Sequence, residues 1–103
     1  LHVPFYSIVA LPGPGRVSAP LQGTQARLAR TDANNDGQLA AADAIVPGSR
    51  LLGYVNADHW AIAIPLSREL PLLRGLFVDD VPRTELVLAT LAIIDQETFR
   101  TQP

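Results

Sequence analysis

The sequence predicts an α/β fold with parallel strands and a long C-terminal helix. Two short apolar runs with β-branched and aromatic residues, at 3–11 and 49–55, are typical of strands buried on both faces in a parallel sheet. About forty residues separate these runs, which is enough for the crossover that joins parallel neighbours. The third observation is the segment 83–99, the clearest helix in the chain. Its middle is apolar nearly all round, so we expect it to be heavily buried.

The crossover between the two strands is expected to be irregular. The first strand ends at the turn-forming sequence Pro-Gly-Pro-Gly at residues 12–15. After it we expect a short helix over residues 21–30 and then a polar loop at 31–37, full of turn-forming residues. One or two helical turns are predicted within residues 39–46.

The segment between the second strand and the final helix carries fewer signals. A helical turn is expected at residues 60–64, and residues 66–78 are predicted to be an apolar linker that Pro and Gly interrupt. Asp79 and Asp80 are interpreted as capping residues of the final helix, and Pro82 fits its first turn.

Length and composition exclude several classes of protein. The 103 residues suit one small domain, and 48% of them are apolar, which is enough for a hydrophobic core. The net charge of -2 and the scattered arginines lack the basic footprint of a nucleic-acid-binding protein. No apolar stretch approaches the roughly 18 residues of a membrane span, and without cysteine there is no disulfide or thiolate metal site. We therefore expect a soluble protein and favour the cytoplasm.

The predicted elements do not add up to a complete sheet. Two strands are too few for independent stability, and the final helix needs more apolar surface than these elements offer. The sequence also begins at Leu1 rather than at methionine. We therefore expect residues 1–103 to be one unit from a larger α/β domain. Its apolar faces would be covered by self-association or by association with a missing N-terminal part.

Two side chains with catalytic potential follow the two strands. Asp36 lies in the polar loop of the crossover, and His59 comes just after the second strand. Because functional groups of open α/β sheets gather at the carboxyl ends of the strands, parallel strands would bring both side chains to one edge. An aspartate that accepts a hydrogen bond from the histidine Nδ1–H would fix the tautomer and stabilise the imidazolium. The alternative interpretation gives neither residue a catalytic role. Asp36 would then be a turn residue before Gly37, and His59 an ordinary loop histidine.

The residues around both positions resemble the C-terminal part of the α/β-hydrolase family. The resemblance rests on Asn-Asp-Gly-Gln-Leu at residues 35–39 and on Gly-Tyr-Val-Asn-Ala-Asp-His-Trp-Ala-Ile-Ala-Ile-Pro at residues 53–65. In that family the triad follows the chain order nucleophile, acid, histidine, and a helix closes the fold. The resemblance implies an esterase- or lipase-like serine hydrolase that acts on a small ester-type substrate without a cofactor. His59 would be its general base and acid, and Asp36 the partner that orients His59.

One part of the family pattern is missing. The nucleophile elbow Gly-x-Ser-x-Gly does not occur, and four serines lack its context: Ser7, Ser18, Ser49 and Ser67. An acid and a base without a nucleophile and oxyanion donors cannot carry out acyl transfer at a useful rate. We therefore expect these groups on a preceding portion of the protein, and no activity from this chain alone.

Residues 32–43 support an alternative function. They match the EF-hand pattern of oxygen-bearing side chains, with glycine at the sixth position and a carboxylate at the twelfth, and they resemble dockerin-like loops. This alternative is a small calcium-binding module that recognises a protein partner, with the ligands Asp32, Asn34, Asp36, Gln38 and Asp43. The flanking segments fit it less well, because the Pro-Gly at residues 47–48 leaves room for only about one turn of outgoing helix. The two interpretations compete for Asp36.

Two neighbours of His59 also have alternative interpretations. Asp58 is the other candidate acid partner, although adjacent residues at a strand end usually point apart. Trp60 is expected to pack on the top of the sheet rather than to line a substrate site.

Overall fold

The two predicted strands pair in parallel at the centre of the molecule. The computed structural model describes residues 3–101. Within them β1 (Tyr6–Ala10) and β2 (Arg50–Val55) form a two-stranded parallel sheet, in which the register shifts by one residue after Ser7. The predicted parallel arrangement is therefore confirmed, and the carboxyl ends of both strands lie at the same edge of the sheet.

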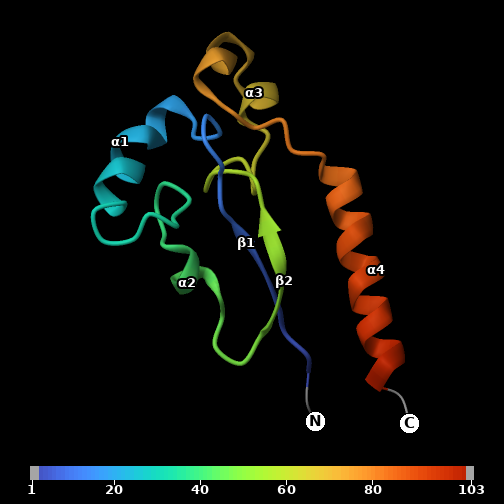
Figure 1. Cartoon of the computed structure of the whole chain (residues 1–103). Helices are drawn as coiled ribbons and strands as arrows, with labels where there is room; N and C mark the ends of the chain where they lie inside the picture. The colour runs from blue at the N-terminus through green and yellow to red at the C-terminus, as the bar shows by residue number, and fades with distance from the viewer. Residues whose placement is uncertain (1–2, 102–103) are drawn as a thin grey trace.

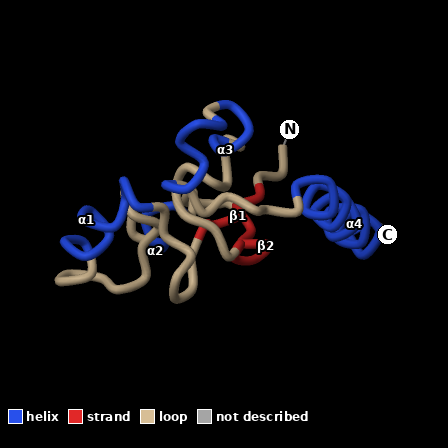
Figure 2. Tube along the Cα trace, turned by 90° about the horizontal axis from the view of Figure 1, so that it is seen from above, coloured by secondary structure: helices blue, strands red, loops and turns tan. Residues whose placement is uncertain are grey.

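The crossover covers one face of this sheet. α1 (Ala19–Leu28) and α2 (Ala41–Ala44) lie on this face, with the polar loop between them (Figures 1 and 2). α1 begins slightly earlier than predicted, because Pro20 is favourable in a first turn, where its missing N–H would have no intrahelical partner. α2 is a single turn, as short as the sequence predicts.

The buried core is small and lies around β1, the crossover helices and the turn that follows β2. Among the residues whose burial the structure describes, six apolar ones make up this core, and most of them are alanine: Val9, Ala10, Leu21, Ala41, Ala57 and Ala61. Because burial of apolar area is the main favourable term in folding, so few large side chains contribute modest stabilisation. Leu21, only 1% exposed, is the largest of them.

The long helix α4 (Arg83–Thr101) lies along the other face of the sheet (Figure 1). A shallow groove of about 160 Å³ separates part of α4 from β2, and Leu86 and Ile93 line it from the helix. Arg50 and Glu97 also form an ion pair of 3.1 Å between the two elements. Within residues 3–101, none of the helices has the combination of length and hydropathy that a membrane span requires.

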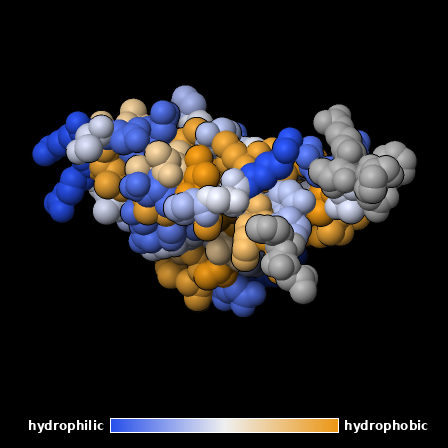
Figure 3. Space-filling view, turned by 90° about the horizontal axis from the view of Figure 1, so that it is seen from below, coloured by the Kyte–Doolittle hydropathy of each residue, from blue (hydrophilic) through white to orange (hydrophobic). Residues whose placement is uncertain are grey.

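The prediction of a heavily buried final helix is wrong for this chain. Leu88 is 61% exposed and Leu91 57%, and Tyr54 in the strand opposite is 55% exposed. The middle of α4 is apolar nearly all round, but a two-stranded sheet covers only one stripe of a helix. Figure 3 shows apolar side chains gathered on the face of the molecule seen from below.

The segment before α4 is more regular than the predicted linker. It contains α3 (Leu66–Glu69) and a 3₁₀ helix (Pro71–Leu76). Proline presets the backbone for the first turn of the 3₁₀ helix, as it does at the start of an α-helix. Several leucines of this segment are largely exposed, Leu72 at 99%.

Asp79 and Asp80 do not cap α4 as predicted. Oδ2 of Asp79 accepts a hydrogen bond of 2.7 Å from the backbone N–H of Ser67, which lies in the first turn of α3. Asp80 accepts a hydrogen bond from the Arg16 guanidinium, and this contact holds the pKa of that carboxyl below its ordinary value. Both carboxylates therefore join segments that are distant in the sequence, a role that local capping patterns do not reveal.

Candidate active site

The polar loop of the crossover is folded around the carboxylate of Asp36. This residue is 5% exposed. Its Oδ1 accepts hydrogen bonds from the backbone N–H groups of Gln38 at 3.0 Å and Leu39 at 2.7 Å. Its own backbone N–H donates to the carbonyl of Leu39 at 3.0 Å, which closes the loop. The loop therefore fixes the carboxylate with one oxygen and leaves Oδ2 for another partner.

Gly37 makes this tight loop sterically allowed. Its φ of +101° lies in the region that side chains disfavour, and a Cβ built on it would lie 3.0 Å from Cβ of Leu21. The loop can therefore approach α1 closely only because residue 37 has no side chain.

Asn35 anchors the same loop to the end of α1. It is 1% exposed, and its Oδ1 accepts the N–H of Gly37 at 2.9 Å. Its Nδ2 donates to the backbone carbonyls of Asp32 at 3.0 Å and Gln25 at 3.3 Å. The sequence pattern gave Asn35 no role of its own. The only signal was its place in the Asn-Asp-Gly triplet, because its partner Gln25 lies ten residues away.

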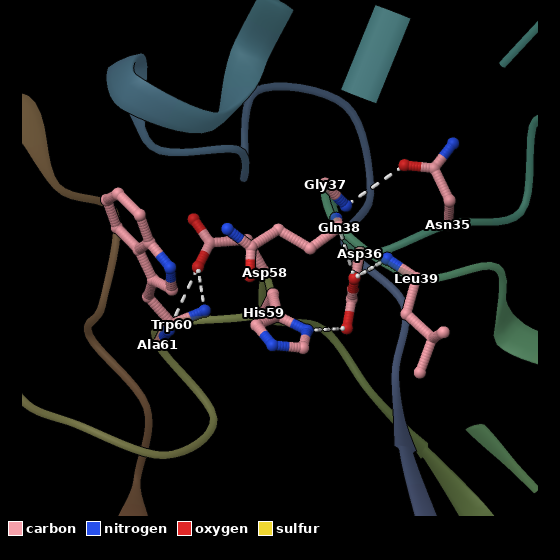
Figure 4. A network of polar contacts seen from close by, with 9 residues as sticks. All are labelled: Asn35, Asp36, Gly37, Gln38, Leu39, Asp58, His59, Trp60 and Ala61. Carbon is pink, nitrogen blue, oxygen red and sulfur yellow. Dashed lines mark hydrogen bonds and ion pairs between the residues drawn. The ribbon is translucent and has the colours of Figure 1, made fainter. Parts of the chain in front are cut away.

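His59 meets Asp36 at the carboxyl end of the sheet. It follows β2 by four residues, and its backbone N–H donates to the carbonyl of Asp36 at 2.8 Å. In the side chains, Nδ1 of His59 lies 2.7 Å from Oδ2 of Asp36 (Figure 4). An ionised carboxylate only accepts hydrogen bonds, so we assign the proton to Nδ1. The contact that the triad interpretation requires between these side chains is therefore present.

The two partners differ in exposure. The side chain of Asp36 is 7% exposed and that of His59 39%. Within residues 3–101 nothing is hydrogen-bonded to Nε2 of His59, and no serine hydroxyl reaches this ring. The pair therefore combines a buried, fixed acid with an imidazole whose second nitrogen is available to a further group.

Asp58 is not the acid partner of His59. It is 0% exposed, and its Oδ1 accepts the backbone N–H groups of Trp60 at 3.1 Å and Ala61 at 2.9 Å. Its Oδ2 accepts the backbone N–H of Ser18 at 2.7 Å. Asp58 is thus committed to backbone groups, and its carboxylate points away from the imidazole (Figure 4).

Trp60 packs against the ring of Phe77. The centroids of Trp60 and Phe77 are 6.4 Å apart, with the planes tilted by 59°. Trp60 also lines an apolar cavity of about 450 Å³ that includes Pro20 and residues of the segment 64–77. Its ring points away from the ring of His59 (Figure 4).

The carboxylates of the predicted calcium loop do not gather around one point. Oδ1 of Asp32 accepts the N–H of Asn34 at 2.9 Å, and both oxygens of Asp36 have the partners given above. Asp43 lies in α2. In the part of the chain that the structure describes, no group of three or more acidic, histidine or cysteine side chains is placed to hold a metal ion. Calcium binding stays a prediction, which a calorimetric titration of the chain and of its Asp32→Ala variant would test.

No protein-family model matches the chain, and no curated protein does. Among solved structures, the chain is similar to a crystal structure of the metagenomic carboxyl esterase MGS0156, with 42% sequence identity and a TM-score of 0.81. The match covers 92% of this chain and 29% of the esterase chain. The chain therefore spans less than a third of that neighbour, and its fold corresponds to a segment of an esterase.

Proposed function

We propose that this chain supplies the acid and the histidine of the catalytic triad of a serine ester hydrolase. The observation that carries the proposal is the 2.7 Å contact between Oδ2 of Asp36 and Nδ1 of His59. The order acid, then histidine, along the chain and the likeness to a segment of a carboxyl esterase support it.

In this mechanism Asp36 directs the proton chemistry of His59. Its carboxylate holds the proton on Nδ1, so Nε2 carries the lone pair that accepts the proton of an attacking hydroxyl. The negative charge beside the ring then stabilises the imidazolium until Nε2 returns the proton to the leaving alkoxide. Because the N–H groups of Gln38 and Leu39 hold the other oxygen of Asp36, the carboxylate keeps its orientation through both steps.

The nucleophile and the oxyanion donors would come from a segment outside these 103 residues. The sequence contains no Gly-x-Ser-x-Gly, and both groups are needed to form and to stabilise the tetrahedral intermediate. We expect the substrate to be an ester of a small molecule, which is attacked to give an acyl-enzyme that water then hydrolyses.

The test joins this chain to a polypeptide that carries a nucleophile elbow. Donors are taken from the part of the similar carboxyl esterase that lies outside the match, chosen for a Gly-x-Ser-x-Gly sequence, and are either fused to this chain or mixed with it. We call the product the complemented enzyme. It should hydrolyse a nitrophenyl ester of a short fatty acid, and replacement of His59 by alanine should remove this activity. The chain alone should show no turnover.

Besides a complemented enzyme that hydrolyses no ester, two results would contradict the proposal. One is hydrolysis by the complemented enzyme at the same rate after His59→Ala. The other is hydrolysis by the isolated chain, because a nucleophile would then lie within it. The exposed carboxylate of Asp43 supplies a matched control, since Asp43→Asn changes a carboxylate near the site in sequence without touching His59.

A further inference from the structure

A fully buried carboxylate adjoins His59 in the chain and takes no part in its contact with Asp36. Asp58 is 0% exposed, and within residues 3–101 no cation is paired with it. Burial of an ionised carboxylate is costly unless hydrogen bonds replace its hydration. The three backbone N–H groups that donate to Asp58 compensate for this cost, so their arrangement indicates what the residue does.

The two oxygens of Asp58 serve different segments. Oδ1 accepts the N–H groups of Trp60 and Ala61, and this closes the turn that begins at His59. Oδ2 accepts the N–H of Ser18, the residue just before α1. Asp58 therefore both shapes the turn and ties it to a helix about forty residues away in sequence.

Asp58 repeats the local geometry of Asp36. In each case Oδ1 accepts the N–H groups of the second and third residues that follow, and Oδ2 reaches a distant group. For Asp36 that group is the imidazole, and for Asp58 it is the backbone of Ser18. The two carboxylates thus fix the two sides of the Asp36–His59 contact, one holding the acid and the other the backbone that carries the histidine.

The turn around His59 has a second anchor on its far side. The Arg83 guanidinium, at the start of α4, donates to the backbone carbonyls of Ala61 and, at 3.3 Å, Ile62. Ser18 extends the same network, because its Oγ accepts the N–H of Val78 at 2.8 Å. The backbone of His59 is therefore held against α1 through Asp58 and against α4 through Arg83.

We propose that Asp58 is a positioning residue that sets the place of the His59 imidazole relative to Asp36 by holding the turn 58–61 against the start of α1. It does so without touching the ring. The proposal builds on the role proposed above for His59, so its test reads the ring itself as well as the activity.

The experiment compares Asp58→Asn and Asp58→Ala with the same changes at Asp79. Asparagine keeps one oxygen for the N–H groups of Trp60 and Ala61, but it turns an NH₂ group toward the N–H of Ser18. Asp79 is the matched control, because its carboxylate also accepts a backbone N–H at 2.7 Å but serves α3. The readouts are the imidazole ¹H and ¹⁵N resonances of His59 in the 103-residue chain, and kcat and KM of the complemented enzyme.

In the Asp58 variants we expect the hydrogen-bonded Nδ1–H resonance of His59 to weaken or disappear. The kcat of the complemented enzyme should fall roughly 10- to 100-fold with KM unchanged, the penalty typical of a misplaced catalytic group. The Asp79 variants should leave both readouts as they are. The proposal is overturned if the Asp58 variants keep the Nδ1–H resonance and kcat, even where they unfold at lower urea concentration.

Two further outcomes are also decisive. If Asp58→Ala does not fold, Asp58→Asn settles the question, because it keeps two of the three hydrogen bonds and the size of the side chain. If the complemented enzyme with all residues intact hydrolyses no ester, the proposed function fails, while the imidazole resonances still decide whether Asp58 positions His59.

Discussion

The carboxyl end of the sheet buries polar side chains, whereas the helix α4 exposes apolar ones. At the sheet end Asn35, Asp36 and Asp58 are 1%, 5% and 0% exposed, and each is hydrogen-bonded to backbone N–H groups. On α4, Leu88 and Leu91 are 61% and 57% exposed. The usual distribution of polar and apolar residues is reversed between these two regions.

The difference shows which kind of structure a short segment can complete by itself. One oxygen of a carboxylate can accept hydrogen bonds from the backbone N–H groups of the second and third residues that follow it. A polar loop therefore needs few hydrogen-bond partners from distant segments. An apolar helix needs area on several sides, which only further layers of a domain provide. The acid–histidine contact is therefore complete within the described residues, whereas the apolar faces of α4 depend on additional surface.

The largest effect on activity is expected from Asp36→Asn. This substitution leaves the polar loop folded but replaces the oxygen that accepts the Nδ1–H of His59 with a hydrogen-bond donor. In Asp36→Asn the amide oxygen can still accept from Gln38 and Leu39, while the NH₂ group faces Nδ1 of His59. The imidazole would then adopt the wrong tautomer, so kcat of the complemented enzyme should fall by about 10⁴-fold. Steady-state kinetics would measure this. A kcat equal to that of Asp43→Asn would show that Asp36 is not the acid.

The same substitution on two leucines would measure the contrast in burial directly. Leu21→Ala removes a side chain that is 1% exposed and should lower the free energy of unfolding by about 2–5 kcal/mol. Leu91→Ala changes a side chain that is 57% exposed and should have an effect within about 0.5 kcal/mol in the chain alone. Urea unfolding of both variants provides the measurement. Equal losses would mean that α4 is covered in solution, for example by a second copy of the chain.

Substitution of two glycines tests how closely the polar loop approaches α1. Gly37 lies in the loop, and Gly23 in α1 is the comparison. Gly37→Ala introduces a Cβ at φ +101°, 3.0 Å from Leu21, and should cost about 1–3 kcal/mol of unfolding free energy. Gly23→Ala places a Cβ in open space within α1 and should stabilise the chain by roughly 0.5–1 kcal/mol. Thermal and urea unfolding would separate the two signs. If Gly37→Ala were neutral, the close approach of loop and helix would not hold in solution.

The smallest effect is expected at the exposed contact between Arg16 and Asp80. This contact lowers the pKa of Asp80 below its ordinary value of 3.8. The carboxylate form is favoured in the folded state, so its contribution to stability is present above about pH 3.8 and is lost as the pH falls through the lowered pKa. The difference in stability between the chain and Asp80→Asn should be small at pH 7, because the pair is exposed, and should vanish in more acidic solution. Urea unfolding at a series of pH values would show it, and a difference that grew on acidification would contradict the assignment.

Much of the candidate site could be predicted from patterns of residues that are close in sequence. The apolar runs predicted both strands and their parallel pairing, and the position of Asp36 and His59 after them predicted the edge at which they lie. The partners of Asn35 and Asp58 could not be predicted in this way. Gln25 and Ser18 contribute backbone groups, and a backbone N–H or carbonyl has no sequence signature.

The sequence by itself determined the strands, the crossover, the long helix and the two side chains that carry the proposed chemistry, because periodicity and turn-forming residues are local properties. Only the tertiary structure decided that Oδ2 of Asp36 meets Nδ1 of His59, that Asp58 ties the histidine turn to α1, and that α4 leaves its apolar side chains exposed. Those outcomes depend on which surfaces lie side by side, and the area available to cover a helix is a property of the whole assembly of elements rather than of any one of them.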